Sequence, residues 1–169
     1  MASCRAGNVL GGGDWAQNRL IPDFILAIAK GQPVKIRNPQ SVRPWQHVLD
    51  PLSGYLLLAE RLFVHGPIYA EGWNFGPNDD AKSVSFLLYH WIQSWGKGAS
   101  WTLDADSHPH EAHSIKLDCT KANIRLGWHP KWPLAVALDH VVAWQKQYEQ
   151  GANMRAVTLS QIKAYAHAT

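Results

Sequence analysis

The sequence predicts an α/β fold. Apolar residues that recur at helical spacing alternate along the chain with short apolar runs typical of strands. Turns are frequent, with 13 Gly and 10 Pro in 169 residues, so the elements should be short. Hydrophobic residues make up 46% of the chain and charged residues 17%, which supplies a core and excludes disorder along the whole length.

The first forty residues predict a strand, a glycine loop, a helix and a second strand. Residues 2–10 form a short mixed run that ends at the glycines of residues 11–13, as a strand entering a tight loop does. Pro22 favours the first turn of a helix, which we expect to end at Gly31. Residues 33–37 then alternate polar and apolar side chains, as a strand does.

The middle of the chain predicts a loop, a long helix and a third strand. Residues 38–46 are polar and contain proline, which indicates a loop. Asp50 is placed to cap a helix that opens with Pro51 and carries apolar residues on one face as far as Leu62. A short strand is expected over residues 73–75.

The last part of the chain predicts three helices with short strands between them. Ser83 is expected to cap the first of these helices. Residues 101–103 and 115–117 are strand candidates, and residues 118–126 form a short helix. Pro133 opens a longer amphipathic helix.

Charge and cysteine content exclude several classes of protein. The net charge is +3 with histidine neutral, and the basic residues are scattered, so we expect no nucleic-acid partner. Cys4 and Cys119 have no metal-binding spacing and are interpreted as small, buried apolar residues. Apolar runs such as residues 55–59 are too short to cross a membrane, and the first residues lack a signal-peptide core. We therefore expect a soluble, cytoplasmic protein.

Residues 11–16 match the letters of a dinucleotide-binding loop, Gly-x-Gly-x-x-Ala. Such a loop opens directly into a helix, and an acidic residue follows the next strand. Here the helix signal waits until Pro22, and residues 33–37 carry no acid. A structural or substrate-facing loop is therefore favoured over a dinucleotide site.

Residues 108–113 read His-Pro-His-Glu-Ala-His and invite a metal interpretation. Zinc proteases need His-Glu-x-x-His so that both imidazoles share one helical face. The spacing here is one residue shorter, and Pro109 interrupts the run. We favour a polar loop beside a ligand, with a metal-dependent hydrolase as the weaker alternative.

Arg43 stands beside Trp45 in the polar loop. A guanidinium binds phosphate through two parallel hydrogen bonds. A surface arginine stacked on Trp45 explains the pair equally well, so both interpretations stay open. Helix capping or turn formation is the expected role of four aspartates: Asp14, Asp50, Asp118 and Asp139.

Five segments, in this order and spacing, resemble one protein family: Arg5-Ala-Gly-Asn8-Val-Leu-Gly-Gly-Gly-Asp14, Arg19-Leu-Ile-Pro22-Asp, Val42-Arg-Pro-Trp-Gln-His-Val-Leu-Asp50, Trp73-Asn-Phe-Gly76 and Leu126-Gly-Trp-His-Pro130. Together they resemble the C-terminal half of extended short-chain dehydrogenases/reductases that act on nucleotide sugars. The resemblance covers about residues 2–150. The versions Arg-Pro-Trp-Gln-His and His-Glu-Ala-His are most similar to members that dehydrate CDP-glucose.

The resemblance implies the last strands of a Rossmann-type sheet and a small α/β substrate-binding lobe. We expect both within residues 1–151, with residues 152–169 as a tail that has a weak helical pattern. In the family a tightly held NAD takes a hydride from C4 of the sugar, water leaves across C5–C6, and the hydride returns to C6. Members usually form homodimers, and the implied pathway is deoxysugar synthesis for a bacterial surface polysaccharide such as O-antigen.

One departure from the family pattern concerns catalysis. A Tyr-x-x-x-Lys pair runs the first step in the family, and no tyrosine of this sequence is followed by lysine four residues later. The chain therefore looks like a truncated enzyme that binds its nucleotide sugar, retains no NAD and has no catalytic residue of its own. A non-catalytic CDP-sugar-binding or interaction domain is the alternative.

The matching positions imply substrate contacts by Asn8, Arg19, Leu20, Lys35, Ile36, Arg37, Arg43, Asn78, His108, His110 and Glu111. Arg43 is expected to bind the diphosphate, and Asn8 the sugar or phosphate. Residues 35–37 resemble the strand that lines the base site. Asn78 and residues 108–111 resemble loops that close over the nucleotide.

Overall fold

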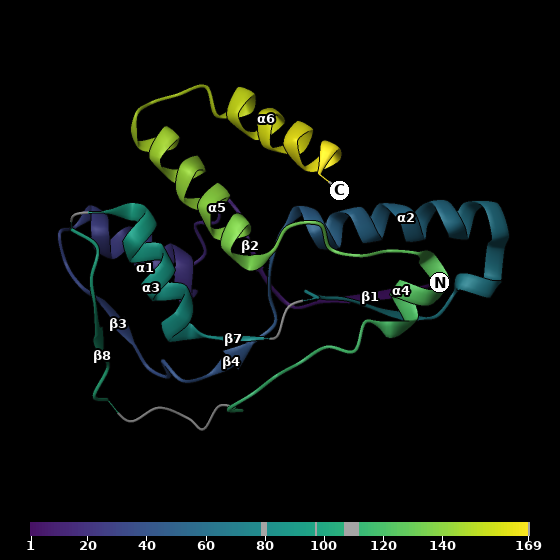
Figure 1. The fold of residues 1–169 in the computed structure, drawn as a ribbon, viewed down its shortest axis with the longest axis horizontal. Coiled ribbons are helices and arrows are strands. Elements are labelled where there is room, and N and C mark those ends of the chain that lie inside the picture. The colour runs from purple at the N-terminus through teal and green to yellow at the C-terminus, as the bar shows by residue number, and fades with distance from the viewer. Residues whose placement is uncertain (79–80, 97, 107–111, 169) are drawn as a thin grey trace.

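The structure is a computed structural model that describes residues 1–78, 81–96, 98–106 and 112–168 (Figure 1). Its strands are β1 (Ser3–Ala6), β2 (Asn8–Leu10), β3 (Val34–Ile36), β4 (Val42–Arg43), β5 (Trp45–His47), β6 (Gly72–Phe75), β7 (Lys82–Ser83) and β8 (Trp101–Leu103). Its α-helices are α1 (Leu20–Ala29), α2 (Leu49–His65), α3 (Val84–Trp95), α4 (Thr120–Leu126), α5 (Leu134–Glu149) and α6 (Met154–His167), and a 3₁₀ turn covers Gly66–Tyr69. Within these residues no helix has the length and apolar character needed to cross a membrane.

The strands form four pairs, and three of these are parallel: β1 with β6, β2 with β5, and β3 with β8. The fourth pair, β4 with β7, is antiparallel. Parallel pairs joined through helices are the arrangement expected of an α/β fold. The fold class predicted from the sequence is confirmed.

Gly7 lets one extended segment serve two strand pairs. The chain pairs with β6 before Gly7 and with β5 after it. The amide of Asn8 donates to the carbonyl oxygen of Pro44 at 2.9 Å. A Cβ atom on Gly7 would lie 2.1 Å from that same oxygen, so only glycine permits this approach.

Two hydrophobic cores divide the molecule. The pocket region, as we call it, comprises β2, β3, β5, β8, α1, α3 and α5 around the larger core, whose buried residues include Phe24, Leu87, Trp91, Leu138 and Val141. The α2 region comprises β1, β6, α2 and α4 around a smaller core of Leu58, Trp73, Phe75, Ala122, Leu126 and Trp128. Figure 1 shows the two regions side by side, with α6 lying over α5.

Several predicted elements are confirmed. Ser83 caps α3, where its hydroxyl accepts a hydrogen bond from the amide of Phe86 at 3.2 Å. The strands at β6 and β8 and the helices α1, α4 and α5 lie within one or two residues of their predicted positions. Asp118 accepts from the amide of Thr120 at 2.9 Å as α4 begins. The tail contains the regular helix α6, while the division at residue 151 stays a prediction.

The predicted loop over residues 38–46 is wrong, because it contains β4 and most of β5. Trp45, Gln46 and His47 are all buried, so neither face of β5 is exposed to solvent, and the sequence shows no alternation of polar and apolar residues there. The strand predicted over residues 115–117 is also wrong. Residues 115–117 form no strand; Ser114 before them makes an isolated bridge with Val42, and the amide of Ile115 donates to the carbonyl oxygen of Val42 at 3.1 Å.

Three predictions for single residues are wrong as well. Asp50 does not cap α2; it is fully buried in the first turn, and its Oδ1 accepts from the amide of Lys131 and the hydroxyl of Tyr165, both at 2.8 Å. Asp139 lies inside α5, where its Oδ1 lies 2.9 Å from His90 Nε2 and accepts from the hydroxyl of Ser94 at 2.8 Å. Cys4 is exposed. In the aspartates, tertiary partners have replaced the local backbone partner that a cap would use.

Candidate functional site

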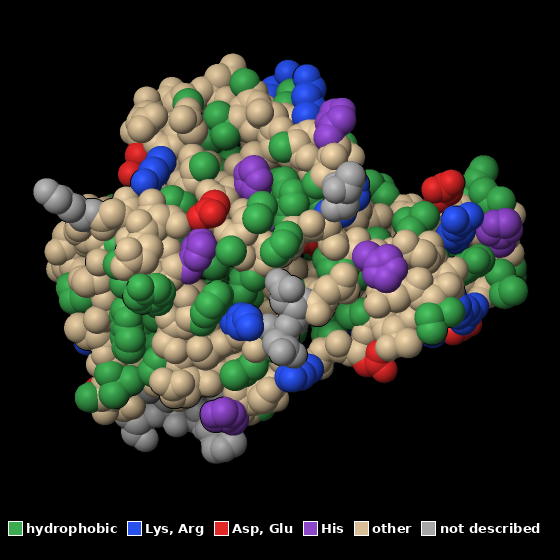
Figure 2. Space-filling view, in the orientation of Figure 1, with side chains coloured by type: hydrophobic (Ala, Val, Ile, Leu, Met, Phe, Trp, Pro, Cys, Tyr) green, Lys and Arg blue, Asp and Glu red, His purple; other side chains and the backbone are tan. Residues whose placement is uncertain are grey.

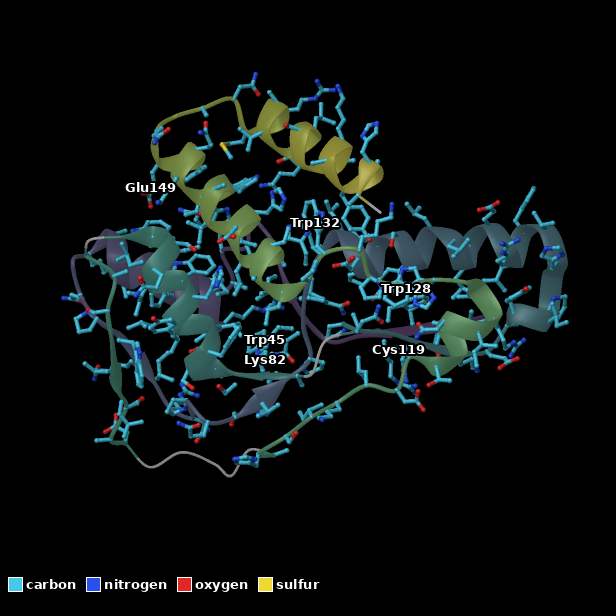
Figure 3. The ribbon with its side chains drawn as sticks, in the orientation of Figure 1. Trp45, Lys82, Cys119, Trp128, Trp132 and Glu149 are labelled. Carbon is cyan, nitrogen blue, oxygen red and sulfur yellow. The ribbon has the colours of Figure 1, made fainter. Side chains whose placement is uncertain are left out.

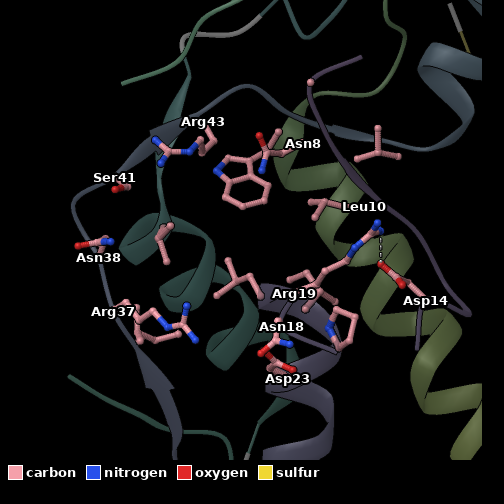
Figure 4. Close-up of a pocket in the computed structure, with 18 of the residues that line it drawn as sticks. Asn8, Leu10, Asp14, Asn18, Arg19, Asp23, Arg37, Asn38, Ser41 and Arg43 are labelled. Carbon is pink, nitrogen blue, oxygen red and sulfur yellow. Dashed lines mark hydrogen bonds and ion pairs between the residues drawn. The ribbon is translucent and has the colours of Figure 1, made fainter. Parts of the chain in front are cut away.

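A cavity of about 730 Å³ opens in the pocket region (Figure 4). Its walls come from β2 and the loop after it, the start of α1, β3, and the β4–β5 segment. Seven residues predicted from the sequence line it: Asn8, Arg19, Leu20, Lys35, Ile36, Arg37 and Arg43. Segments far apart in the chain therefore bring these residues to one cavity.

Arg43 is the most buried charged side chain of the cavity wall, at 9% exposure. Its Nη1 donates to the carbonyl oxygen of Val42 at 2.9 Å, with a longer contact of 3.4 Å to that of His113. These carbonyls hold the guanidinium in the wall. The alternative of a surface arginine is wrong, because the side chain is not at the surface.

Trp45 contributes an aromatic wall beside Arg43. Its Nε1 donates to the carbonyl oxygen of Lys82 at 3.1 Å, and the two residues lie together where β5 approaches β7 (Figure 3). A buried indole with a satisfied N–H presents a rigid apolar face. The ring therefore has a fixed position in the wall.

Arg19 and Asp14 form an ion pair at the edge of the cavity, 3.3 Å between Nη1 and Oδ2 (Figure 4). Asp14 also accepts from the amide of Ala16 at 3.1 Å, which fixes the loop between β2 and α1. The Arg19 side chain is 64% exposed, so solvent weakens its pairing with Asp14. An anionic ligand can therefore compete for Arg19 at low cost.

The opposite wall is formed by β3 and the first turn of α1. Ile36 is buried, whereas Lys35 and Arg37 on either side of it are exposed. Partial burial raises the pKa of the Asp23 carboxyl, while the backbone N–H of Asn18 and the charge of Arg37 act in the opposite direction. This wall thus carries both an acidic side chain, Asp23, and basic side chains, Lys35 and Arg37.

The cavity carries both signs of charge. Its basic side chains are Arg19, Lys35, Arg37 and Arg43, and its carboxylates are Asp14, Asp23 and Asp104. A ligand that fits this lining is anionic in one part and carries hydrogen-bond donors in another. Such a ligand is recognised by polar contacts set between apolar walls.

Other predicted residues are not brought to the cavity. Asn78 is exposed and is not among the described residues that line it. His108, His110 and Glu111 lie outside the described residues. In residues 1–78, 81–96, 98–106 and 112–168, no cluster of three or more histidine, cysteine or acidic side chains could hold a metal ion.

Several cavity residues were not predicted from the sequence. Asn18, Asp23, Asn38, Ser41 and Asp104 all line it. Asp23 follows Pro22 and ends one of the five segments that carry the family resemblance, so its charge is a sequence signal for a cavity residue. Asn38 and Ser41 lie in a polar segment without periodicity, which gives no signal.

The glycine loop does not fit a dinucleotide. A Cβ atom on Gly12 would lie 2.2 Å from the ring of Trp144, so this glycine serves close packing on α5. The next helix, α1, begins only at Leu20. No helix N-terminus opens at the glycines to receive a pyrophosphate, as a dinucleotide site requires. The favoured interpretation of a structural or substrate-facing loop agrees with Gly11 lining the cavity.

Comparisons with known proteins give relatives both by sequence and by fold. No protein-family model matches the chain. CDP-glucose 4,6-dehydratase of Salmonella typhimurium is 54% identical over 170 residues, an alignment that covers 100% of this chain and 47% of the relative. The chain therefore spans about half the length of the curated relative it matches.

Solved structures share the fold at lower identity. UDP-glucuronic acid 4-epimerase of Bacillus cereus, solved with UDP-glucuronic acid and NAD, has a TM-score of 0.73 at 20% identity and covers 86% of this chain and 45% of its own. dTDP-glucose 4,6-dehydratase of Bacillus anthracis, solved with NAD, has a TM-score of 0.69 at 20% identity and covers 89% of this chain and 46% of its own. UDP-glucose 4-epimerase of Thermotoga maritima, solved with UDP-glucose, has a TM-score of 0.72 at 23% identity and covers 87% of this chain and 46% of its own. These likenesses establish the fold.

Proposed function

We propose that this chain belongs to the extended short-chain dehydrogenase/reductase family and forms the nucleotide-sugar-binding half of a CDP-glucose 4,6-dehydratase. The observation that carries this proposal is the meeting of Asn8, Arg19 and Arg43 in one cavity. The cavity volume of about 730 Å³ lies within the usual range for small-molecule sites. Identity of 54% to a CDP-glucose 4,6-dehydratase supports the choice of substrate.

Arg43 binds the diphosphate in this proposal. A buried guanidinium forms short, strong hydrogen bonds to phosphate oxygens and matches their geometry with its planar fork. Arg19 lies at the cavity edge, with its head in solvent, and reaches the same anion from the other side. Asn8 at the start of β2 offers an amide that donates to, or accepts from, the sugar or phosphate.

The base lies against β3 and α1 in this proposal. Leu20 and Ile36 supply apolar surface, and Lys35 and Arg37 flank it. Asn78, His108, His110 and Glu111 remain proposed contacts of the loops that close over the nucleotide. The two free cysteines, one of them exposed, favour a reducing compartment, so we place the protein in the cytoplasm.

NAD supplies the hydride chemistry in the proposed full-length enzyme. The residues of this chain do not fit its pyrophosphate, so we propose that NAD is held elsewhere and that this chain positions the sugar nucleotide. The sequence has no Tyr-x-x-x-Lys pair. We therefore expect binding of CDP-glucose by this chain without turnover.

Calorimetric titration of the chain with CDP-glucose tests the proposal. The Arg43→Lys variant keeps the positive charge and loses the fork, so we expect a drop in affinity of roughly tenfold to a hundredfold. Arg5→Lys is the matched control, because Arg5 is exposed on β1 and is not among the cavity residues; its affinity should equal that of the parent chain. Absent binding by the parent chain, or equal affinity of the Arg43→Lys variant, contradicts the proposal.

A CDP-sugar-binding domain without any catalytic role is a second candidate, favoured by the absent Tyr-x-x-x-Lys pair. Incubation of the purified chain with CDP-glucose and NAD addresses it through detection of the 4-keto-6-deoxy product. No product is expected from the chain alone in either case. Product formed by the chain alone would contradict both proposals, because each expects binding of CDP-glucose without turnover.

A further inference from the structure

Asp23 is an unexpected residue in a cavity proposed to bind a diphosphate. A carboxylate repels phosphate, so its presence in the wall needs a reason. Asp14 is paired with Arg19, and Asp104 accepts from the amide of Asp106 at 3.2 Å. Asp23 lies in the first turn of α1, half-buried, and lines the cavity together with Asn18, whose backbone N–H donates to its carboxyl.

The cavity has two chemically different ends. In Figure 4, Arg43 and Asn8 lie at one end and Asp23 at the other, with Arg37 on the wall across from Asp23. A nucleotide whose diphosphate is bound by Arg43 therefore extends a different group toward Asp23. Leu20 and Pro22 line the cavity near Asp23 and supply apolar surface against which a planar base can lie, with Asn18 as a polar neighbour.

Pyrimidine bases differ in what they offer to a carboxylate. Cytosine presents an amino group, which donates, where uracil and thymine present a carbonyl oxygen, which accepts. An ionised carboxylate only accepts hydrogen bonds. A carboxylate at the base position therefore favours cytosine and disfavours the other two.

The comparisons divide along the same line. The relative with 54% identity acts on a CDP-sugar by name, whereas the fold neighbours at 20–23% identity are named for UDP- and dTDP-sugars. We propose that Asp23 determines base specificity, by accepting a hydrogen bond from the amino group of cytosine. The inference rests on the proposed nucleotide-sugar site and assigns its selectivity to one side chain.

Titration of the intact chain with CDP and with UDP isolates the base, because both ligands carry the same ribose and diphosphate. We expect the parent chain to bind CDP about tenfold more tightly than UDP, or better, which is the usual discrimination of one good base contact. The Asp23→Asn variant should bring the two affinities within about threefold, because its amide can rotate to donate to the uracil oxygen.

Two further variants separate the base contact from other effects. Asp23→Glu keeps the carboxylate and should retain the CDP preference. Glu60→Gln removes a negative charge from an exposed site on α2 outside the cavity and should leave the ratio unchanged. Arg43→Lys should weaken CDP and UDP by the same factor, since both carry the diphosphate.

Three results overturn the inference. Equal binding of CDP and UDP by the parent chain removes base selectivity while leaving the nucleotide site in place. Equal weakening of both ligands by Asp23→Asn, with the ratio retained, assigns Asp23 to the shared ribose and diphosphate. No binding of either ligand removes the inference together with the proposed function.

Discussion

The pocket region and the α2 region differ in where their charged and apolar side chains gather. In the pocket region the helices bury one face in the larger core, leaving single side chains such as Leu26 and Tyr89 exposed, and basic and acidic side chains gather around a cavity. In the α2 region the helix α2 exposes large apolar side chains: Leu52, Leu56, Phe63 and Val64 are 44%, 74%, 93% and 62% exposed. At the right of Figure 2, where α2 ends, hydrophobic and charged side chains share the surface.

This contrast separates two kinds of surface. A cavity lined by fixed polar groups between apolar walls is suited to a small ligand. A helix face that leaves several large apolar side chains in water is suited to contact with protein.

The largest expected effect compares the same substitution in both regions. Leu138 on α5 is fully buried in the larger core, and Leu138→Ala should lower the free energy of unfolding by about 2–5 kcal/mol. Leu56→Ala on α2 is the matched control and should change it by less than about 0.5 kcal/mol. Urea unfolding followed by tryptophan fluorescence measures both. Similar losses from the two variants would erase the contrast between the regions.

The second effect concerns pH and belongs to the pocket region. Burial, and after it the neighbouring charge of His140, lower the pKa of His47 on β5 to about 4. Its Nδ1 accepts from the amide of Leu49 at 3.2 Å, which requires the neutral ring. In the unfolded chain the pKa is near 6.5, so only the unfolded state gains the proton as pH falls from 6.5 to 4.

Stability should therefore be lost as pH falls through that window, by up to about 3 kcal/mol from His47 alone. Urea unfolding at pH 7 and at pH 4.5 measures the loss. The His47→Gln variant keeps an acceptor for the Leu49 amide and should lose clearly less stability between the two pH values. An identical pH dependence in parent and variant would assign the loss to other groups.

The smallest effect on stability is expected on α2. Phe63→Asp places a charge at a side chain that is 93% exposed, so the free energy of unfolding should change by no more than about 0.5 kcal/mol. The same variant should reduce self-association at high concentration, because it interrupts the exposed apolar face. Light scattering against concentration measures this. Unchanged association would show that the face does not drive contacts between copies.

The sequence predicted elements wherever local chemistry agrees with the final packing. Ser83 caps α3 because its hydroxyl satisfies a nearby amide, and that interaction needs no distant partner. Asp50 has the same local pattern, yet its partners are Lys131 and Tyr165, more than eighty positions away. Propensity carries no information about such partners, so the cap prediction failed. For the same reason the polar residues Gln46 and His47 predict a loop, although both are buried in β5.

The cavity was predicted in part, and by a different route. Arg19, Arg37 and Arg43 carry no common periodicity, and only the family resemblance placed them together. Asn38 and Ser41 went unpredicted because polar residues between elements are ordinary in any sequence. Asn78 shows the limit of the resemblance, since the described residues around the cavity do not include it.

Gly7 joins the two regions through a single residue without a side chain. The strand before it belongs to the α2 region, and the strand after it supplies Asn8 to the cavity. One residue thus separates the backbone that pairs with β6 in the α2 region from the side chain that lines the cavity, so the register of β1 and the position of Asn8 are set together.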